Sequence, residues 1–325
     1  MDKNLDSRGV HEMPETAPAP QAAPYSRIAV MGTGAVGGYF GGMLARAGLD
    51  VTFIARPATA EAITRTGLFL DSFQFKETIH PRATSDLAAV HGAELVLFCV
   101  KTLDTESAAR ALAPNLSPRS IVLSLQNGVD NVERLRAAGL DAFPAVVYVA
   151  ASVPEPGHIK HFTRGDLAIG GESSRKADLD RIAATFTRAG VPCLISDNIQ
   201  AELWLKFVFN CALNAMSAIA RTSYGAIGND DWGRDAMLAA ARETIAVGRA
   251  SGIPIPEQEL LDKLTTFAKK MGDVTSSTEQ DVGRRRHTEV DALNGYVVRR
   301  GAELGVPTPV NHTLTALLKL IEAKF

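Results

Sequence analysis

Short apolar runs alternate with helical patterns over the first half of the chain. The predicted strands are 27–31, 51–55, 94–100, 121–125 and 145–153, and the predicted helices between them are 35–47, 58–66, 105–113 and 129–138. Continuous apolar strands that alternate with amphipathic helices are typical of a parallel sheet with helices on both faces. The pattern therefore predicts an α/β fold with a doubly wound sheet of the Rossmann type.

Four further segments complete this first part of the chain. Residues 68–79 alternate between apolar and polar positions, which predicts a hairpin or edge strands, and we expect another hairpin around 157–170. A helix over 175–189 and a strand over 193–196 follow. Together these elements predict a first domain over residues 26–197.

After Asp197 the strand signals disappear and the sequence has only helical patterns. We expect helices at about 199–219, 233–251, 257–271, 278–304 and 311–323. These predict an all-helical second domain over residues 198–325. At the other end, residues 1–25 hold four prolines among alanine, glutamine and charged residues, and we expect a disordered leader there.

Composition and charge narrow the functional classes. A chain of 325 residues with 46% hydrophobic and 22% charged residues is typical of a globular protein with two domains. The net charge of −2 equals that of the leader alone, and a neutral body argues against nucleic acid or an anionic membrane as the main partner. Three cysteines in apolar runs, at no metal-ligand spacing, indicate reduced thiols, no metal site and a cytoplasmic location.

One uncharged run raises the question of a membrane span. The 18 residues of 28–45 lie between Arg27 and Arg46 and reach the lower limit of transmembrane length. Six of these 18 residues are glycine, and their order has a better explanation. The run also begins too late for a signal peptide, so we expect neither insertion nor export.

A glycine-rich turn connects the first predicted strand to the first predicted helix. It consists of Gly32, Thr33, Gly34, Ala35, Val36 and Gly37. In a strand–turn–helix unit this spacing allows a tight turn, close approach of the backbone to a pyrophosphate, and close packing of helix on strand. The helix N-terminus then binds the anion, so the motif predicts a dinucleotide site.

The end of the second strand indicates which dinucleotide is bound. NAD-binding proteins usually carry an acidic residue there for the ribose hydroxyls, whereas this chain has Arg56 after Phe53-Ile54-Ala55. Arginine pairs with phosphate through two hydrogen bonds, which favours NADPH over NADH. A solvated loop arginine is the alternative.

Polar residues also follow the next two buried strands. Lys101 comes directly after Val100, and Asn127 lies in the sequence Gln126-Asn127-Gly128. Ligands of doubly wound sheets bind outside the carboxyl ends of the strands, so both side chains are candidates for cofactor contacts. The alternative for Asn127 is a simple turn before a glycine.

One predicted helix carries a polar stripe on an otherwise apolar surface. Lys206, Asn210 and Asn214 are spaced four residues apart and share one face, while the remaining residues are mostly apolar. Polar groups on a buried helix need partners, so we expect the stripe to face a cleft, with a solvent-facing stripe as the alternative.

A second polar cluster lies in the last third of the chain. Ser276 or Ser277 is expected to cap a helix, and the free backbone N–H groups there can bind a carboxylate. The run Arg284–Arg286 is more typical of a solvated face than of an anion site. Glu289 precedes apolar residues at helical spacing, so its carboxylate needs a partner.

These motifs together resemble the ketopantoate reductases (2-dehydropantoate 2-reductases) from residue 27 to the end of the chain. The resemblance is carried by the glycine turn, Val100-Lys101, Gln126-Asn127-Gly128, the Lys206 helix, and the sequences SSTEQD and RRRHTEVDALNG. It implies a Rossmann domain and a helical domain with the site between them. It also implies the reduction of ketopantoate to pantoate by NADPH, on the route to pantothenate and coenzyme A.

The resemblance also implies roles for individual residues. Lys206 matches the proton donor, Asn127 a contact to cofactor and substrate, and Glu289 a position beside the cofactor ribose. Substrate contacts are implied for Asn210, Asn214 and Ser277, and cofactor contacts for Gly32–Gly37, Arg56, Lys101 and, on a looser alignment, Ala151.

One departure from the family pattern affects the predicted substrate. The ketopantoate reductases that the chain resembles have a substrate-binding asparagine where this sequence has Tyr224. The alternatives are therefore a reductase of another branched 2-oxo acid, a hydroxy-acid dehydrogenase of the same architecture, and an NADP-binding sensor without turnover. The sequence is compatible with a monomer or a homodimer.

Overall fold

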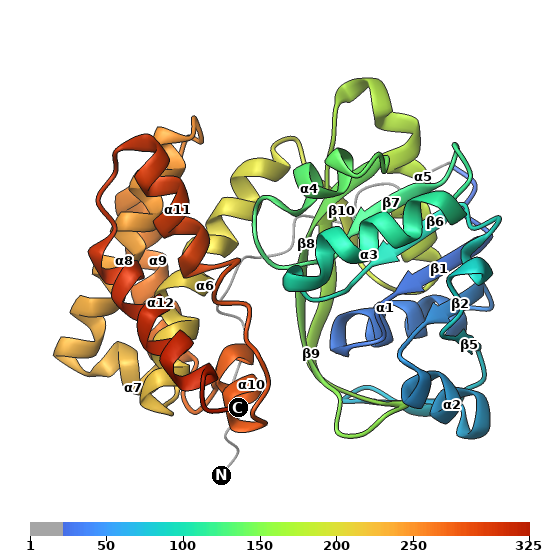
Figure 1. The fold of residues 1–325 in the computed structure, drawn as a ribbon, viewed down its shortest axis with the longest axis horizontal. Helices are drawn as coiled ribbons and strands as arrows, with labels where there is room; N and C mark the ends of the chain where they lie inside the picture. Colours follow the sequence, from blue (N-terminus) through green and yellow to red (C-terminus); the bar gives the residue numbers. More distant parts are fainter. Residues whose placement is uncertain (1–21) are drawn as a thin grey trace, which may run out of the picture.

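The computed structural model describes residues 22–325, so the predicted leader lies almost wholly outside the described residues. Figure 1 shows two parts, one built on a sheet and one built of helices. The strands are β1 (Arg27–Met31), β2 (Asp50–Ile54), β3 (Leu68–Ser72), β4 (Lys76–Ile79), β5 (Arg82–Thr84), β6 (Leu95–Phe98), β7 (Ile121–Ser124), β8 (Ala142–Ser152), β9 (His158–Ile169) and β10 (Cys193–Ile195).

The α-helices of the sheet-based part are α1 (Ala35–Arg46), α2 (Pro57–Thr66), α3 (Thr105–Leu112), α4 (Asn131–Ala137) and α5 (Lys176–Arg188). After β10 the described elements are all helical: α6 (Ile199–Ala220), α7 (Tyr224–Asn229), α8 (Asp231–Ala250), α9 (Glu257–Lys270), α10 (Ser277–Gly283), α11 (Asn294–Leu304) and α12 (Pro309–Glu322). The predicted class, a Rossmann-type α/β part followed by a helical part, is confirmed.

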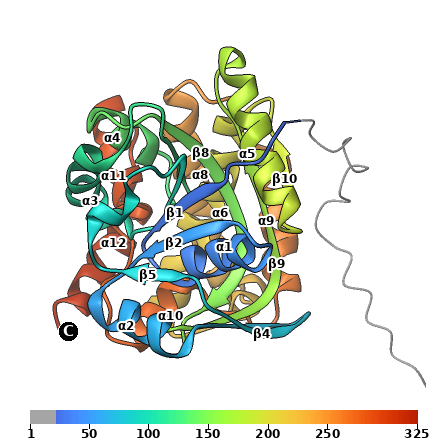
Figure 2. The ribbon, with the colours of Figure 1, turned by 90° about the vertical axis from the view of Figure 1, so that its right-hand side faces the viewer.

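The strands form one sheet in the order β4-β3-β9-β8-β7-β6-β1-β2-β5, with β10 paired to β9. Strands β5, β2, β1, β6, β7 and β8 run parallel, as the apolar runs predicted, whereas β8 and β9 are antiparallel. Helix α1 contacts both β2 and β9, so the sheet curves around it (Figure 2). Apolar side chains fill both faces, with α1 and α5 on one side and α3 and α4 on the other.

The carboxyl ends of the parallel strands are aligned in register. Met31 pairs with Phe98, Phe98 with Ser124, and Ser124 with Pro144. Strands β1, β6 and β7 end at Met31, Phe98 and Ser124, so the loops that follow them leave the sheet at one edge, whereas β8 continues past it to Ser152. This alignment brings together the glycine turn and the segments that carry Lys101 and Asn127.

The structure differs from two of the predicted elements, the hairpin at 157–170 and the helix at 278–304. The expected hairpin at 157–170 is the single long strand β9, which is antiparallel to β8. Gly165, with φ +130°, lies inside β9 near a register shift, where a Cβ would stand 2.1 Å from the Tyr39 hydroxyl oxygen. The glycine therefore makes a close approach possible and does not form a chain reversal.

The expected helix over 278–304 is also interrupted, because α10 ends at Gly283 and α11 begins at Asn294. In the gap, the Thr288 N–H and hydroxyl both donate to the buried Glu322 carboxylate of α12, at 2.7 and 2.6 Å. Long-range hydrogen bonds thus replace helical ones in this segment. The short elements β5 and α7 were not predicted.

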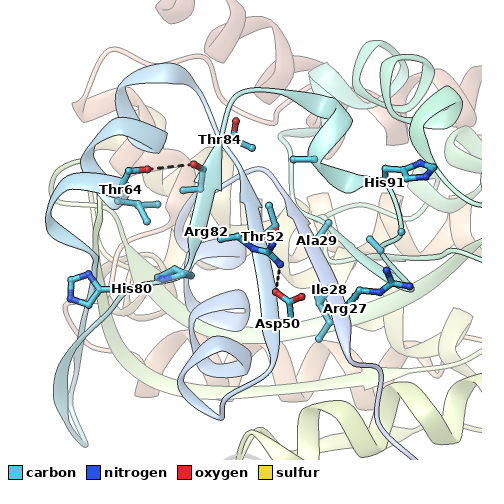
Figure 3. Close-up of a pocket in the computed structure, with 16 residues that line it drawn as sticks. Arg27, Ile28, Ala29, Asp50, Thr52, Thr64, His80, Arg82, Thr84 and His91 are labelled. Atoms are coloured by element: carbon cyan, nitrogen blue, oxygen red, sulfur yellow. Dashed lines mark hydrogen bonds and ion pairs between the residues drawn. The ribbon is translucent and has the colours of Figure 1, made fainter.

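The sheet is not covered everywhere by helices. A cavity of about 700 Å³ lies over β1, β2 and β5, lined by Ala29, Thr52 and Arg82 among others (Figure 3). The connection from β5 to β6, residues 85–94, contains the four-residue 3₁₀ helix Leu87–Val90 in place of a longer α-helix, which leaves this face open. The cavity lies at the amino ends of β1 and β2, away from the edge that carries the predicted site.

Helix α6 is the one helix within residues 22–325 that is long and apolar enough to cross a membrane. More than half of its most apolar 18-residue window, 56%, is buried inside the protein, where it contacts α8, α10 and α12. Its apolar composition is therefore explained by its place in the core of the helical part. The uncharged run 28–45 forms β1, the glycine turn and most of α1.

Tyr25 belongs to the folded body, although we expected it at the end of the leader. Its ring is 2% exposed and lies 4.0 Å from the Arg181 guanidinium carbon. Its backbone N–H donates to Thr185 Oγ1 at 2.9 Å, while its hydroxyl is buried without a hydrogen-bond partner.

We expect Tyr25→Ala to lower the free energy of unfolding by about 3 kcal/mol or more, the usual cost of removing a buried aromatic ring. Tyr25→Phe should be neutral or slightly stabilising, because it removes only an unpaired buried hydroxyl. Urea unfolding of both variants measures this. An alanine variant as stable as the unmodified protein would show that Tyr25 contributes nothing to the core.

Candidate functional site

The glycine turn has the close contacts that its spacing predicted. Gly32 adopts φ +98°, and a Cβ there would stand 2.9 Å from the Cys99 carbonyl carbon. A Cβ on Gly37 would lie 2.1 Å from the Gly32 carbonyl oxygen, so helix α1 packs directly onto the turn. A Cβ on Gly34 would meet no atom within 4 Å, so the middle of the turn is open.

Two observations on this turn fit a bound dinucleotide. Gly34 is the N-cap of α1, and no side chain caps this helix, so its first N–H groups are available to an anion. The Thr33 hydroxyl is buried and has no hydrogen-bond partner. Ala35 and Val36 form the first turn of α1. These residues can therefore hold a pyrophosphate at a helix N-terminus.

Arg56 lies two residues after the end of β2 and is the N-cap residue of α2. Its side chain is exposed, and its backbone carbonyl accepts hydrogen bonds from Thr59 and Ala60. No carboxylate occupies the end of β2, so a guanidinium stands where NAD-binding proteins place an acid.

The Lys206 ammonium connects the helical part to the sheet. It donates to the Val147 carbonyl of β8 at 2.6 Å and to Asn127 Oδ1 at 3.1 Å. Burial lowers the pKa of Lys206 to about 8, although the Glu289 carboxylate opposes this shift, and Arg164 adds to the lowering. An ammonium with this pKa can give up a proton near neutral pH.

Glu289 joins Asn127 and Thr102 in the same network. Its Oε2 accepts from Asn127 Nδ2 at 3.1 Å, and its Oε1 accepts from the Thr102 N–H and hydroxyl at 3.2 and 3.1 Å. The Asn127 amide therefore accepts from Lys206 and donates to Glu289. This fixes the orientation of an amide that sequence reasoning could only place near the cofactor.

Lys101 makes a further connection between the two parts. Its ammonium donates to Asp281 Oδ2 and to the His287 carbonyl, both at 2.8 Å. Burial raises the pKa of Asp281, against the lowering effect of the hydrogen bond from Lys101. A cofactor phosphate at Lys101 therefore competes with Asp281 for the same ammonium.

The rest of the polar stripe lies where the helix pattern predicted. Asn210 is partly buried, and Asn214 is 5% exposed with its Oδ1 accepting from the Tyr224 hydroxyl at 2.8 Å. Ser276 caps α10 by accepting from the Glu279 N–H, and its hydroxyl donates to the Asn214 carbonyl at 3.1 Å. Ser276 therefore ties α10 to α6.

Two predicted contact residues are less closely tied to this network. Ser277 begins α10 and is exposed, so its hydroxyl is accessible to a ligand. Ala151 lies near the end of β8, opposite His161 and beside a register shift. No described contact joins either side chain to Lys206.

Comparisons with known proteins agree with this geometry. The family model described as "Ketopantoate reductase PanE/ApbA" matches residues 28–173, and the model of its C-terminal part matches residues 198–322. The chain belongs to the ketopantoate reductase family. It is accordingly an oxidoreductase that acts on CH–OH groups and uses a nicotinamide cofactor.

Full-length relatives support the family membership. The 2-dehydropantoate 2-reductase of Vibrio cholerae is 32% identical over 298 residues, with 91% of this chain and 97% of the relative covered. That of Halobacterium salinarum is 31% identical over 304 residues, with 91% and 99% covered. A PanE/ApbA family ketopantoate reductase from Ralstonia eutropha JMP134 superimposes with a TM-score of 0.86 at 47% identity, covering 92% of this chain and 99% of that chain.

The fold also extends to other dehydrogenases. A D-mandelate dehydrogenase solved with NADH and anilino(oxo)acetate superimposes with a TM-score of 0.86 at 22% identity, with 92% of this chain and 99% of that chain covered. At this identity the likeness shows the fold alone.

The structure of this ketopantoate reductase family member adds two residues, Thr102 and Asp281, and one contact that the sequence did not predict. Thr102 holds Glu289, Asp281 pairs with Lys101, and the Tyr224 hydroxyl donates to Asn214. Their partners are 187, 180 and 10 residues away along the chain, and side-chain pairs at such separations leave no periodic signal.

The glycine turn yields a pair of matched variants. Gly34→Ala should fold at a cost of about 1 kcal/mol or less, because its Cβ meets open space. It should raise the Kd for NADPH and for NADH about tenfold or more, because that Cβ enters the space a pyrophosphate needs. Gly37→Ala should instead lower the Tm, because its Cβ collides with the Gly32 carbonyl. Thermal unfolding and fluorescence titration separate the two effects, and unchanged dinucleotide binding by Gly34→Ala would contradict the assignment.

Proposed function

We propose that this chain reduces ketopantoate to pantoate with NADPH, on the route to pantothenate and coenzyme A, with Lys206 as the proton donor. The observation that carries the proposal is the Lys206 ammonium, held by Val147 and Asn127 at the sheet edge that also carries the glycine turn. The relatives named 2-dehydropantoate 2-reductase support this substrate.

In this proposal the two parts of the chain have different roles. Residues 26–197 bind the cofactor through Gly32–Gly37, Arg56, Lys101 and Ala151, and residues 198–325 supply the substrate contacts Asn210, Asn214 and Ser277. Asn127 and Glu289 act at the junction. We place the enzyme in the cytoplasm, as a monomer or a homodimer.

Reduction of a ketone places negative charge on its oxygen. The bound nicotinamide supplies the hydride, and the chain must neutralise the charge that develops. An ammonium 2.6 Å from a carbonyl and 3.1 Å from an amide oxygen is held in position, and its third N–H is available for the substrate. Lys206 then donates a proton to the oxygen, while Glu289 keeps Asn127 oriented.

Lys206→Ala should lower kcat for ketopantoate reduction by about 10²–10⁴, the range for a lost general acid. It should still bind NADPH, because the glycine turn lies in the other part of the chain. In the unmodified enzyme kcat should fall as pH rises through about 8, because the donor must be protonated. Lys206→Ala should lose this alkaline limb, and Lys206→Arg should keep the charge but remain a poor acid.

A pH–rate series with stopped-flow or steady-state NADPH oxidation measures these effects. A loss of kcat below about tenfold in Lys206→Ala, or an alkaline limb that persists, would reject Lys206 as the acid. A thermal shift with NADPH, without NADPH oxidation on any 2-oxo acid of a panel, would revive the non-catalytic sensor.

Arg56→Ala should raise the KM for NADPH about tenfold while it leaves the KM for NADH nearly unchanged, because only NADPH carries the phosphate that a guanidinium binds. Arg65→Ala is the matched control, since Arg65 is an exposed arginine in the last turn of the same helix. Equal use of both cofactors by the unmodified enzyme would contradict this assignment.

A second candidate function is the reduction of another branched 2-oxo acid, or the corresponding hydroxy-acid dehydrogenase reaction. The observation that favours it is Tyr224, whose hydroxyl is engaged by Asn214 in the substrate stripe. A panel of 2-oxo acids tested with NADPH separates the two.

A further inference from the structure

Three aromatic side chains from α6, α7 and α9 form a cluster beside the polar stripe, joined to it by the Tyr224–Asn214 hydrogen bond. The Tyr224 ring lies 6.1 Å from the Phe267 ring, which lies 5.3 Å from the Phe209 ring. All three are partly exposed, although they pack against the buried core of the helical part. We refer to Phe209, Tyr224 and Phe267 as the aromatic wall.

The backbone holds Tyr224 firmly in the wall. Its N–H donates to the Val274 carbonyl at 2.8 Å, and the preceding Ser223 caps α7 by accepting from the Ala226 N–H. A Cβ on Gly225 would stand 2.5 Å from the Gly272 carbonyl oxygen, so α7 lies directly against the 272–274 segment. The position of the ring is therefore set by local structure and does not depend on a ligand.

The hydroxyl oxygen is the only polar atom of the Tyr224 side chain, and this hydroxyl is already in a hydrogen bond. Its hydroxyl donates to Asn214 Oδ1 at 2.8 Å, and burial raises the pKa of this phenol, so the proton stays in place. This bond fixes the Asn214 amide with its oxygen toward Tyr224, so Nδ2 is the amide group left to donate to another partner. What Tyr224 offers to a ligand is ring carbon.

A branched 2-oxo acid presents three groups to its site: the keto oxygen, the carboxylate and the branch at C3. Lys206 takes the keto oxygen, and the exposed Ser277 at the start of α10 offers a donor for the carboxylate. The aromatic wall has no free donor, so a carboxylate placed against it would lose its hydrogen bonds. The group that fits the wall is the apolar branch at C3.

We propose that Tyr224 determines specificity: its ring, with Phe209 and Phe267, recognises an apolar C3 branch of the 2-oxo acid, and its hydroxyl orients Asn214 toward the substrate. This inference rests on the proposed function, since it requires reduction at Lys206. It implies that the enzyme makes little use of a hydroxyl on that branch.

Two substrates that differ by one oxygen test the proposal. Ketopantoate is 4-hydroxy-3,3-dimethyl-2-oxobutanoate, and its partner is 3,3-dimethyl-2-oxobutanoate, which lacks only the 4-hydroxyl. For the full-length unmodified enzyme with NADPH, we expect the two kcat/KM values to agree within about tenfold. A site built to hydrogen-bond that hydroxyl would discriminate far more strongly.

Three variants separate the roles of the ring and the hydroxyl. Tyr224→Asn replaces the ring with a short amide, and the preference should shift toward ketopantoate by about tenfold or more. Tyr224→Phe keeps the ring, so the ratio should stay within about threefold of the unmodified enzyme while KM rises several-fold for both substrates and kcat changes less. Tyr296→Phe is the control, because Tyr296 packs on Trp204 and Phe207.

The outcomes distinguish this inference from the proposed function. A preference of the unmodified enzyme for ketopantoate above about 100-fold, or an unchanged ratio in Tyr224→Asn, would overturn the inference and leave the proposed function intact. An unchanged KM in Tyr224→Phe would overturn the orienting role. Reduction of neither substrate would overturn both, while comparable reduction of both substrates with the expected shifts supports them.

Discussion

The site depends on one costly interaction, the burial of the Lys206 ammonium between the two parts of the chain. A buried cation must have its N–H groups satisfied, and here the sheet supplies the acceptors, through the Val147 carbonyl and Asn127 Oδ1. The helix that carries the lysine cannot supply them, because its own carbonyls are used in helical hydrogen bonds. The ammonium therefore has these two acceptors only when the two parts meet.

The network behind Lys206 shows how a remote helix positions a group at the sheet edge. Asn127 is held by Glu289, and Glu289 is also held by Thr102. The neighbouring Thr288 is fixed by the buried Glu322 of α12, so the last helix determines where the Glu289 segment lies. A carboxylate thus reaches the site through an irregular segment that is anchored at the buried Glu322 and at Lys101.

The sequence predicted what is local or periodic. The glycine turn, the parallel strands and the stripe of Lys206, Asn210 and Asn214 follow from spacing alone, because spacing determines which residues share a strand end or a helix face. The break at 284–293 did not follow, since it depends on Glu322 far along the chain. The single strand β9 was missed because Gly165 permits close approach to Tyr39, a use of glycine that resembles a turn in the sequence.

The proposed role of Lys206 as proton donor makes opposite demands on stability and on catalysis. Its pKa is about 8 in the folded chain and 10.5 in an ordinary exposed lysine, so the folded state binds fewer protons between these values. Stability that depends on this group therefore rises with pH from about 8 to 10.5, and below about 8 the full cost of the buried charge is present. Proton donation requires the charged form, which is the form that burial penalises. The acceptors on Val147 and Asn127 offset this cost in the pH range where the proposed reaction would need the proton.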